Sequence, residues 1–424
     1  MKLAEFCPLA LPADLNLTHE VFIGSNILEE LPGVIDRYLG DNFLCVADPD
    51  TLKACGQTFN YPVFMLPEHP HADIRFVEHL CREAEHRSGL VAIGGGTVND
   101  ICKMTSTRLN LPYAVIGTAA SMNGYSSGIA AILEDGLKTT RTAIPPRAIL
   151  LDVDILMNAP IELAQAGLGD LLSKSVSTAD YWLSDYLEQS GFDLLPGQIV
   201  DAALNELNQK STGLISQDRE SYYLLARALV LSGVSMVAAG SSSPASGGEH
   251  LISHFWDMEA LIEGKDVRLH GAQVGVASCI CAEIYQKLLD LSKPDFIDPP
   301  LWEDEESRIK QEHGKLADTI IGQAKRKNER ARERINILRN NWQDIRTKIS
   351  AMNLPEPDAI RDILRSVNAP HTLKHLKLSK EYAIRTLCLA RDIRDRITVL
   401  DIAYETGLFP SAIEQVLEDS GVLS

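Results

Sequence analysis

The sequence lacks an excess of basic residues. It contains 40 Lys and Arg against 58 Asp and Glu, so its formal net charge at pH 7 is −18. This charge has the wrong sign for a protein that binds the phosphate backbone of nucleic acids or an anionic membrane surface unaided. We therefore expect no nucleic-acid partner.

Long apolar runs and paired cysteines are also missing. The longest uncharged apolar stretch, residues 228–240, is shorter than the roughly 20 residues of a membrane-spanning helix. Near the N-terminus, Glu5, Pro8 and Pro12 interrupt the only candidate for a signal-peptide core. The eight cysteines are scattered without a CxxC pair, which is typical of reduced thiols and disfavours a cysteine-held zinc. The prediction is a soluble cytoplasmic protein with no membrane span.

The chain has enough apolar material for two or three domains, with 424 residues of which 45% are hydrophobic. Before residue 160, short apolar runs alternate with helical patterns and end in Asp, Gly or Thr. The runs cover residues 43–47, 90–93, 113–116 and 148–151. Such strands, separated by helices, predict a parallel sheet covered on both faces, with a ligand at the carboxyl ends of the strands.

After residue 160, long helical periodicities replace the strand pattern. They cover residues 163–187, 219–239, 250–262 and 272–291. We predict an α/β fold in which a Rossmann-like cofactor-binding domain, residues 1–158, precedes an all-helical metal- and substrate-binding domain, residues 159–424. The charge-rich segment 303–346 is interpreted as a solvated helix face with i,i+4 ion pairs rather than an anion-binding arm.

A glycine loop, Gly94-Gly95-Gly96-Thr97-Val98-Asn99-Asp100, follows one predicted strand and precedes a helical run over residues 101–106. Glycines allow backbone N–H groups to approach a phosphate, and the helix start adds a positive dipole. The loop has neither the GxGxxG fingerprint nor a GK[ST] ending, so ATP is not indicated. A tight turn without a ligand is the alternative interpretation.

Asp48 follows an early predicted strand. A carboxylate at this position accepts hydrogen bonds from an adenosine ribose and repels a 2′-phosphate. The alternative is a helix N-cap before Pro49. Together with the glycine loop, Asp48 favours NAD over NADP.

Three of the eleven histidines, His250, His254 and His270, fall within 21 residues. Residues 241–249 break the structure and then begin a helix, which places His250 and His254 one turn apart on the same face. His270 is expected to open the next helix, and Asp170 is also placed at a helix start. Two imidazoles and a carboxylate can hold a divalent cation and leave a position open for substrate. Which two histidines are ligands stays open at this point.

These features, in this order, resemble the glycerol-1-phosphate dehydrogenase branch of the superfamily of iron-containing alcohol dehydrogenase, glycerol dehydrogenase and dehydroquinate synthase. The motifs that carry the resemblance are GGGTVND (94–100), GTAASMNGYSSGIAAI (117–132), PPRAILLDVDIL (145–156), AGLGDLLSKSVSTADYWL (166–183), GGEHLISHFWDM (247–258), HGAQVGV (270–276) and RDRITVLDIAYETGL (394–408).

The resemblance implies roles for individual residues. Asp170, His250 and His270 match the metal ligands, while Asp170 and His254 match catalytic and substrate-binding positions. The residues that match the cofactor site are Asp48, Gly95, Gly96, Thr97, Val98, Asn99, Asp100, Thr118, Ala119, Ala120, Ser121 and Ser127. Asn123 stands where this branch commonly has a polyol-binding aspartate, and it exchanges a charge for two N–H donors. We expect Asn123 to contact the substrate.

The reaction implied is a reversible, metal-assisted hydride transfer between NAD(P)H and dihydroxyacetone phosphate, which gives sn-glycerol-1-phosphate. The expected cofactors are NAD, with NADP as the second choice, and one Zn, Ni or Fe ion, since these metals share a preference for imidazole. A homodimer or a higher homo-oligomer is expected.

Three alternatives remain. The first is a glycerol or polyol dehydrogenase acting on an unphosphorylated substrate. The second is a dehydroquinate synthase-like lyase, which would need a more basic site and typically has glutamate at the position of Asp170. The third, a catalytically silent protein, predicts the loss of a metal ligand, and none is lost.

Overall fold

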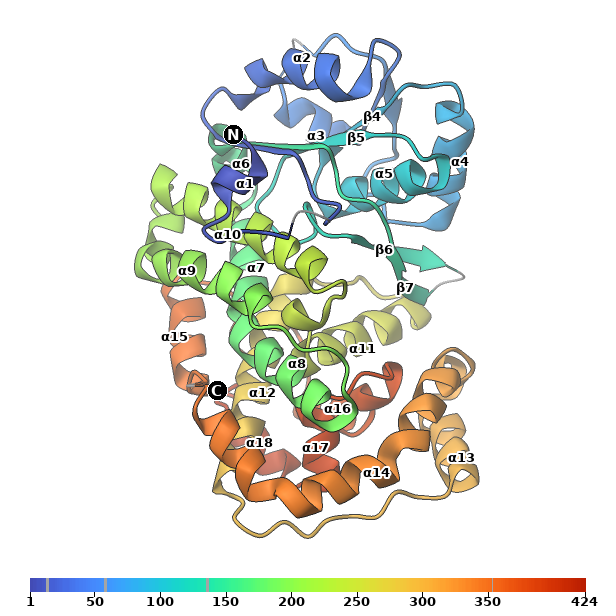
Figure 1. Ribbon diagram of the computed structural model, residues 1–424, viewed down its shortest axis with the longest axis vertical. Coiled ribbons are helices and arrows are strands. Elements are labelled where there is room, and N and C mark those ends of the chain that lie inside the picture. Colours follow the sequence, from blue (N-terminus) through green and yellow to red (C-terminus); the bar gives the residue numbers. More distant parts are fainter. Residues whose placement is uncertain (13–14, 57–58, 135–136, 353) are drawn as a thin grey trace. The chain divides into compact units, whose positions relative to one another are not determined.

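The computed structural model describes residues 1–12, 15–56, 59–134, 137–352 and 354–424 (Figure 1). The chain divides into two compact units. The first contains residues 1–171, 194–242 and 366–368, and the second contains residues 172–193, 243–365 and 369–424. The predicted division into one domain of residues 1–158 and another of residues 159–424 stays a prediction.

A six-stranded parallel sheet forms the centre of the first unit, with the strand order β1-β8-β5-β4-β2-β3. Its strands are β1 (Glu20–Gly24), β2 (Leu44–Ala47), β3 (Val63–Met65), β4 (Leu90–Gly94), β5 (Tyr113–Gly117) and β8 (Ala148–Asp152). Every residue of β2, β4, β5 and β8 is buried. The four predicted strands are therefore confirmed as the inner strands of the sheet.

Helical segments pack on the inner strands. The short helix α2 (Leu31–Val34) and the π-helix Ile35–Leu39 share a buried apolar cluster with alternate residues of β2, β4, β5 and β8. Because side chains alternate across a strand, the remaining residues point to the opposite face. Helix α5 (Gly96–Leu109) also packs against β2, β4 and β5. Burial on both faces explains why the inner strands are continuous apolar runs.

Two edge strands and one hairpin are absent from the prediction. β1 and β3 lie at the two edges of the sheet, and most of their residues are only partly buried. The hairpin pairs β6 (Ile129–Glu134) with β7 (Leu137–Thr142) in antiparallel register. β3 has only three residues, β1 begins with Glu20 and β7 is mostly polar, whereas the apolar run of β6, residues 129–133, was missed by the prediction.

The other helices of the first unit are α1 (Leu3–Phe6), α3 (Pro49–Ala54), α4 (Ile74–Ala84), α6 (Val153–Asn158), α7 (Ile161–Leu172), α9 (Leu195–Lys210) and α10 (Arg219–Ala238). Helix α7 extends one residue beyond this unit. Helix α10 is long and apolar enough to cross a membrane, but 78% of its most apolar window is buried inside the protein. Such burial is typical of a core helix.

Helices are the regular secondary structure of the second unit among its described residues. It contains α8 (Lys174–Glu188), α11 (Gly248–Ile262), α12 (His270–Asp290), α13 (Trp302–His313), α14 (Ala317–Ser350), α15 (Pro357–Ser366, of which the last residue belongs to the first unit), α16 (Lys380–Leu389), α17 (Val399–Glu405) and α18 (Ile413–Asp419). The predicted helical periodicities after residue 160 are thus confirmed, although the run over residues 163–187 is two helices, α7 and α8, separated at Ser173.

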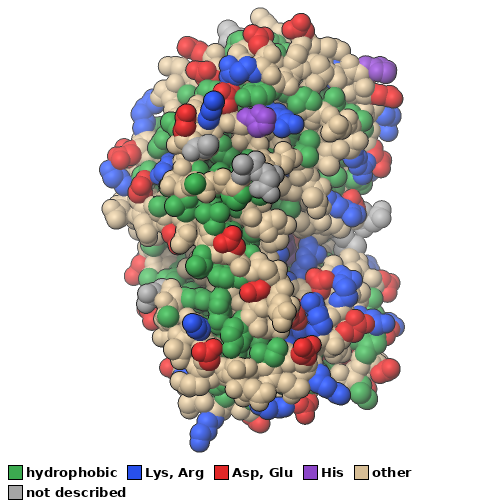
Figure 2. Space-filling view, viewed as in Figure 1, with side chains coloured by type: hydrophobic (Ala, Val, Ile, Leu, Met, Phe, Trp, Pro, Cys, Tyr) green, Lys and Arg blue, Asp and Glu red, His purple; other side chains and the backbone are tan. Residues whose placement is uncertain are grey.

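The charge-rich segment forms α13 and most of α14. In Figure 2, acidic and basic side chains are interspersed over α13 and the adjoining part of α14, and pairs such as Lys310 with Glu306 (2.5 Å) have the predicted i,i+4 spacing. The interpretation as a solvated face is incomplete, however. Lys327 and Arg334 are buried and pair with carboxylates of α17 and its vicinity.

Candidate functional site

The glycine loop lies where β4 passes into α5. β4 ends at Gly94, Gly95 is the N-cap in extended backbone, and α5 begins at Gly96. The first amides of a helix have no partner within the helix, so the N–H groups of Gly96, Thr97 and Val98 are suited to an anion. The helix starts five residues before the predicted run, and the strand-loop-helix arrangement is confirmed.

The loop that follows β5 lies beside the glycine loop. Gly94 and Gly117 pair in the sheet, and the N–H of Thr118 donates to the carbonyl of Gly94 (3.3 Å). The Tyr125 hydroxyl donates to the carbonyl of Ala119 (2.8 Å). The residues predicted to bind the cofactor from Thr118 to Ser121 therefore meet the glycine loop at one edge of the sheet, and their contact with a cofactor stays a prediction.

Asp48 follows β2 at the same edge and caps α3. Its Oδ1 accepts the N–H of Thr51 (2.9 Å), while the Thr51 hydroxyl accepts the N–H of Asp48 (3.1 Å). The alternative interpretation as an N-cap is thus confirmed. Capping does not exclude a ribose contact, because a carboxylate has further lone pairs, so the cofactor role of Asp48 stays a prediction.

Asn99 and Asp100 turn their side chains toward the protein. The amide oxygen of Asn99, which is fully buried, accepts from the Tyr113 hydroxyl (3.4 Å). The Asp100 carboxylate accepts the N–H of Ala131 on β6 (3.0 Å), and its burial raises its pKa. In this structure the two side chains fix the loop against its surroundings.

Lys103 is a buried residue that sequence reasoning missed. Its Nζ donates to the carbonyls of Gly124 (2.6 Å) and Ile129 (2.8 Å) and to the hydroxyl of Ser127 (3.0 Å). Burial lowers its pKa to about 8, and the nearby Asp100 opposes this shift. Lys103 holds the predicted cofactor residue Ser127 in place. Its i,i+3 spacing from Asp100 was the signal in the sequence.

Asp170 lies in the last turn of α7, so its predicted position at a helix start is wrong. α7 continues through Gly167 and Gly169. A Cβ atom on Gly167 would lie 2.0 Å from the carbonyl oxygen of Ala120. Gly167 is therefore needed for the close approach of α7 to the segment that carries Ala120. On α10, a Cβ on Gly233 would similarly meet the Ser126 hydroxyl at 2.1 Å.

Gly167→Ala is expected to lower the free energy of unfolding by about 1–3 kcal/mol, because the new methyl group meets a backbone oxygen that cannot rotate away. Gly322→Ala is the control, since the nearest atom to its Cβ is the end of the Arg326 side chain at 3.9 Å. There the better helix propensity of alanine is expected to leave stability unchanged or raise it. Denaturant unfolding measures both, and equal stabilities would contradict the packing role.

Asn123 contacts Asp170 through two donors. Its backbone N–H donates to Oδ2 of Asp170 (3.1 Å), and its side-chain amide donates to Oδ1 (3.3 Å). Both donors fix the orientation of the carboxylate, which is 1% exposed. An aspartate at position 123 lacks the side-chain donor, so the departure from the family pattern has a structural role here. The predicted contact of Asn123 with substrate is not tested by this geometry.

The three histidines gather in the second unit, as predicted. The ring centroids of His250 and His270 are 5.1 Å apart, those of His254 and His270 are 5.4 Å apart and stacked, and His250 and His254 are 6.2 Å apart on α11. His270 is the first residue of α12, in agreement with the prediction.

Each of the two predicted histidine ligands is oriented by a different buried group. Nδ1 of His250 lies 2.8 Å from the Glu249 carboxylate, which also accepts the N–H of Gly247 (2.8 Å). A carboxylate only accepts, so Nδ1 of His250 carries the hydrogen and Nε2 faces the ligand position.

His270 is oriented by a chain of neutral groups that ends at Asp257. The Asp257 carboxylate accepts from the amide nitrogen of Gln273 (3.0 Å), which turns the amide oxygen of Gln273 toward Ser253. The Ser253 hydroxyl donates its only hydrogen to that oxygen (2.8 Å). Its oxygen, 3.1 Å from Nδ1 of His270, must therefore accept, which leaves the Nε2 lone pair of His270 for a ligand.

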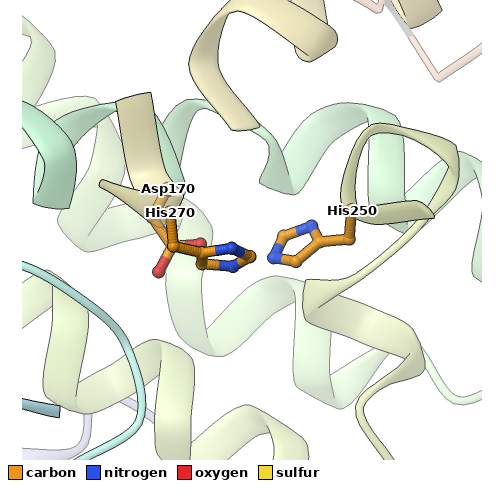
Figure 3. A group of neighbouring side chains, drawn as sticks. All are labelled: Asp170, His250 and His270. Atoms are coloured by element: carbon orange, nitrogen blue, oxygen red, sulfur yellow. The ribbon is translucent and has the colours of Figure 1, made fainter. Parts of the chain in front are cut away.

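Two groups of described residues have the composition and proximity of a cation site. One is Asp170, His250 and His270, drawn in Figure 3, and the other is His254, Asp257 and His270. In each group, one potential ligand atom per residue lies within 4.8 Å of the others, and neither group includes a cysteine. Imidazole nitrogens with a carboxylate oxygen fit Zn, Ni or Fe(II).

Comparisons with known proteins agree with these observations. A family model described as "Iron-containing alcohol dehydrogenase" matches residues 22–160. Proteins named "Glycerol-1-phosphate dehydrogenase [NAD(P)+]" are similar over most of their length. The one from Haloquadratum walsbyi is 33% identical over 64% of this chain and 78% of its own length. The one from Halobacterium salinarum is 27% identical over 96% of this chain and 98% of its own length.

Solved structures share the fold. A probable glycerol dehydrogenase from Sinorhizobium meliloti superposes with a TM-score of 0.64 at 16% identity, over 96% of this chain and 97% of its own. Glycerol dehydrogenase from Schizosaccharomyces pombe superposes with a TM-score of 0.62 at 15% identity, over 98% of this chain and 94% of its own. The predicted fold class, a Rossmann-like part followed by a helical part, is confirmed. The chain is more than 30% identical to two of these relatives and covers more than two thirds of the length of each. It therefore belongs to the glycerol-1-phosphate dehydrogenase branch of the iron-containing alcohol dehydrogenase family.

Proposed function

We propose that this protein interconverts dihydroxyacetone phosphate and sn-glycerol-1-phosphate with NAD(H) or NADP(H). The observation that carries the proposal is the similarity to proteins named glycerol-1-phosphate dehydrogenase [NAD(P)+], which extends over as much as 96% of the chain. The presence of Asp170 and of the oriented histidines argues against a catalytically silent protein.

The proposed metal ligands are Asp170, His250 and His270. The competing group contains Asp257. Its Oδ1 already accepts a hydrogen bond from the side-chain amide of Gln273, and this bond sets the donor and acceptor order of the hydrogen bonds that orient His270. Asp170 is instead held by Asn123 in a defined orientation. A bound Zn, Ni or Fe(II) ion would polarise the substrate carbonyl as a Lewis acid.

The remaining roles belong to side chains of the protein. Glu249 and Ser253 hold the ligand imidazoles in the tautomer that presents Nε2. His254, which is stacked on His270, is proposed to hold the substrate or to deliver a proton to the oxygen of the reduced carbonyl. Asn123 is proposed as a substrate contact in addition to its bonds with Asp170.

The amides of the glycine loop are proposed to bind the cofactor pyrophosphate, as expected at a helix N-terminus, together with residues 118–121 and Ser127. Asp48 is proposed to favour NAD over NADP by repelling a 2′-phosphate. A cytoplasmic homodimer or higher homo-oligomer is the proposed form of the enzyme.

The test is oxidation of NADH and NADPH by the metal-reconstituted enzyme with dihydroxyacetone phosphate, dihydroxyacetone and glyceraldehyde phosphate. We expect the highest kcat/KM with dihydroxyacetone phosphate. A preference for dihydroxyacetone would favour the polyol dehydrogenase alternative. Cofactor oxidation with none of the three substrates would contradict the proposal and return the dehydroquinate synthase-like lyase to consideration.

A further inference from the structure

A cavity of about 270 Å³ lies in the second unit. Its walls come from the face of α11 that carries Trp256, from the connection between α11 and α12, from Gln273 on α12, and from residues between 377 and 382 at the start of α16. Neither His254 nor any of the proposed metal ligands lines it. The volume is slightly below the range of about 300–1,000 Å³ that is typical of small-molecule pockets, so the cavity suits a small ligand.

Three cations and one carboxylate line the cavity. The cations are Lys265, Arg268 and Lys377, and the carboxylate, Glu263, pairs with Lys265 (2.5 Å). Among the described residues, the side chains of Arg268 and Lys377 form no ion pair and no hydrogen bond. Two cations at the wall of one cavity are therefore without a partner in the described part of the chain.

The other nearby carboxylates do not neutralise these two cations. Glu259 pairs with Arg385 (2.5 Å). Asp266 and Glu381 are exposed, do not line the cavity, and form no ion pair with either cation among the described residues. The segment 371–380 is itself basic, with three lysines, two histidines and no carboxylate, in a chain whose net charge is −18. This charge distribution favours an anionic ligand.

Gln273 adds an unused hydrogen-bond donor. Its side chain is buried, its amide oxygen accepts from Ser253 (2.8 Å), and its amide nitrogen donates one hydrogen to Asp257 (3.0 Å). An amide nitrogen carries two hydrogens, and the second has no acceptor among the described residues. A buried donor without an acceptor costs free energy, and an oxygen of an anion in the cavity would remove this cost.

We propose that this cavity, which we name the 268/377 cavity, binds a phosphate group, either as free phosphate or as part of a small metabolite. Arg268 and Lys377 supply the positive charge, and Gln273 supplies the buried N–H. The planar guanidinium offers paired donors that match phosphate oxygens, and lysine adds a point charge. The site is separate from the proposed active site, because none of the residues proposed to act on the ketone lines it.

The contact with Gln273 couples the 268/377 cavity to the metal site. The Gln273 amide determines which way the Ser253 hydroxyl donates and thereby which nitrogen of His270 carries the hydrogen. A phosphate oxygen can accept from the amide nitrogen, so bound phosphate favours the same orientation of the amide. Phosphate therefore strengthens metal binding, and by linkage the metal strengthens phosphate binding. This coupling rests on the metal site of the proposed function, whereas phosphate binding itself does not.

The first experiment is a calorimetric titration of the metal-loaded enzyme with inorganic phosphate. Saturating NAD is present, so that the glycine loop is not available to phosphate. The wild type is expected to bind phosphate, and Arg268→Gln and Lys377→Gln are each expected to bind it at least about tenfold more weakly, the effect of losing one charged hydrogen bond. A parallel titration with 2-phosphoglycolate distinguishes the sources, because tighter binding of this ester identifies a phosphorylated metabolite as the ligand.

Lys374→Gln is the matched control. Lys374 is an exposed lysine of the same basic segment and does not line the cavity. Its removal should leave the dissociation constant of phosphate within about twofold of the wild type, because solvent screens exposed charges. Absence of phosphate binding in the wild type, or equal binding by all three variants, would overturn the inference. A raised KM for dihydroxyacetone phosphate but not for dihydroxyacetone in both cavity variants would show that the cavity holds the phosphate of the substrate, and would overturn its assignment as a separate site.

The second experiment measures the coupling by competition with a chromogenic chelator, with phosphate or with chloride at equal ionic strength. Phosphate is expected to lower the metal dissociation constant of the wild type at least about fivefold more than that of Lys377→Gln, the lower end of typical coupling energies. Phosphate binds free metal equally in both samples, so the difference reports on the protein. An equal effect in the two proteins would overturn the coupling. Phosphate binding in the cavity without reduction of dihydroxyacetone phosphate would refute the proposed function alone.

Discussion

His250→Ala is expected to leave the protein without a bound divalent cation and without dehydrogenase activity. The two remaining ligands, Asp170 and His270, cannot hold the ion tightly, because such sites require at least three protein ligands. The effect should be large because the buried carboxylate of Glu249 holds His250 in the orientation that presents its Nε2. Metal content by mass spectrometry and the rate of NADH oxidation measure the two losses.

His86→Ala provides the control, since His86 is an exposed histidine of the first unit. It should retain both metal and activity. Full metal occupancy in His250→Ala would show that the cation is held by the alternative group of His254, Asp257 and His270 or elsewhere in the chain.

Ser253→Ala is expected to weaken metal binding by about 10- to 100-fold, the usual effect of removing a group that orients a metal ligand. Without the hydroxyl, Nδ1 of His270 loses the acceptor that keeps its hydrogen in place, so the tautomer with a free Nε2 is no longer favoured. The change is small in volume, so the fold should survive. Competition with a chromogenic chelator measures the dissociation constant independently of activity.

Ser278→Ala is a closely matched control. Ser278, on α12, is fully buried like Ser253. Its hydroxyl, however, donates to the carbonyl of Val274 within α12 (2.8 Å). The metal dissociation constant should stay within about twofold of the wild type, because no ligand is touched. If the two serine variants bind metal equally well, the chain from Asp257 to His270 does not orient the ligand.

The fold was predictable where burial acts on whole segments. The inner strands are buried on both faces and therefore form unbroken apolar runs, and the long helices show the corresponding periodicity. The edge strand β1 carries only one buried residue, Val21, and β3 has three residues. Such strands are defined by hydrogen bonds to a neighbour, which leave no pattern in the local sequence.

The candidate site was predictable as a set of residues and less so as an arrangement. The spacing of the histidines placed His250, His254 and His270 together, because one helix turn and one short connection determine their proximity. The position of Asp170 was predicted wrongly, because α7 continues through Gly167 and Gly169 and Asp170 lies in its last turn. The atoms that orient the ligands, on Ser253 and Gln273, depend on contacts between α11 and α12 and could not be derived from spacing.

Substitutions at Gly167 and Gly233 are expected to lower activity although neither residue takes part in the reaction. Neither has a side chain that could take part in chemistry, yet each borders the segment from Ala120 to Ser127, which carries Asn123 and the predicted cofactor residues. In a saturation mutagenesis screen scored by activity, both positions should rank with the residues of the site itself. Positions that tolerate no substitution will then include glycines that only make room for the site, as well as residues that act on the substrate.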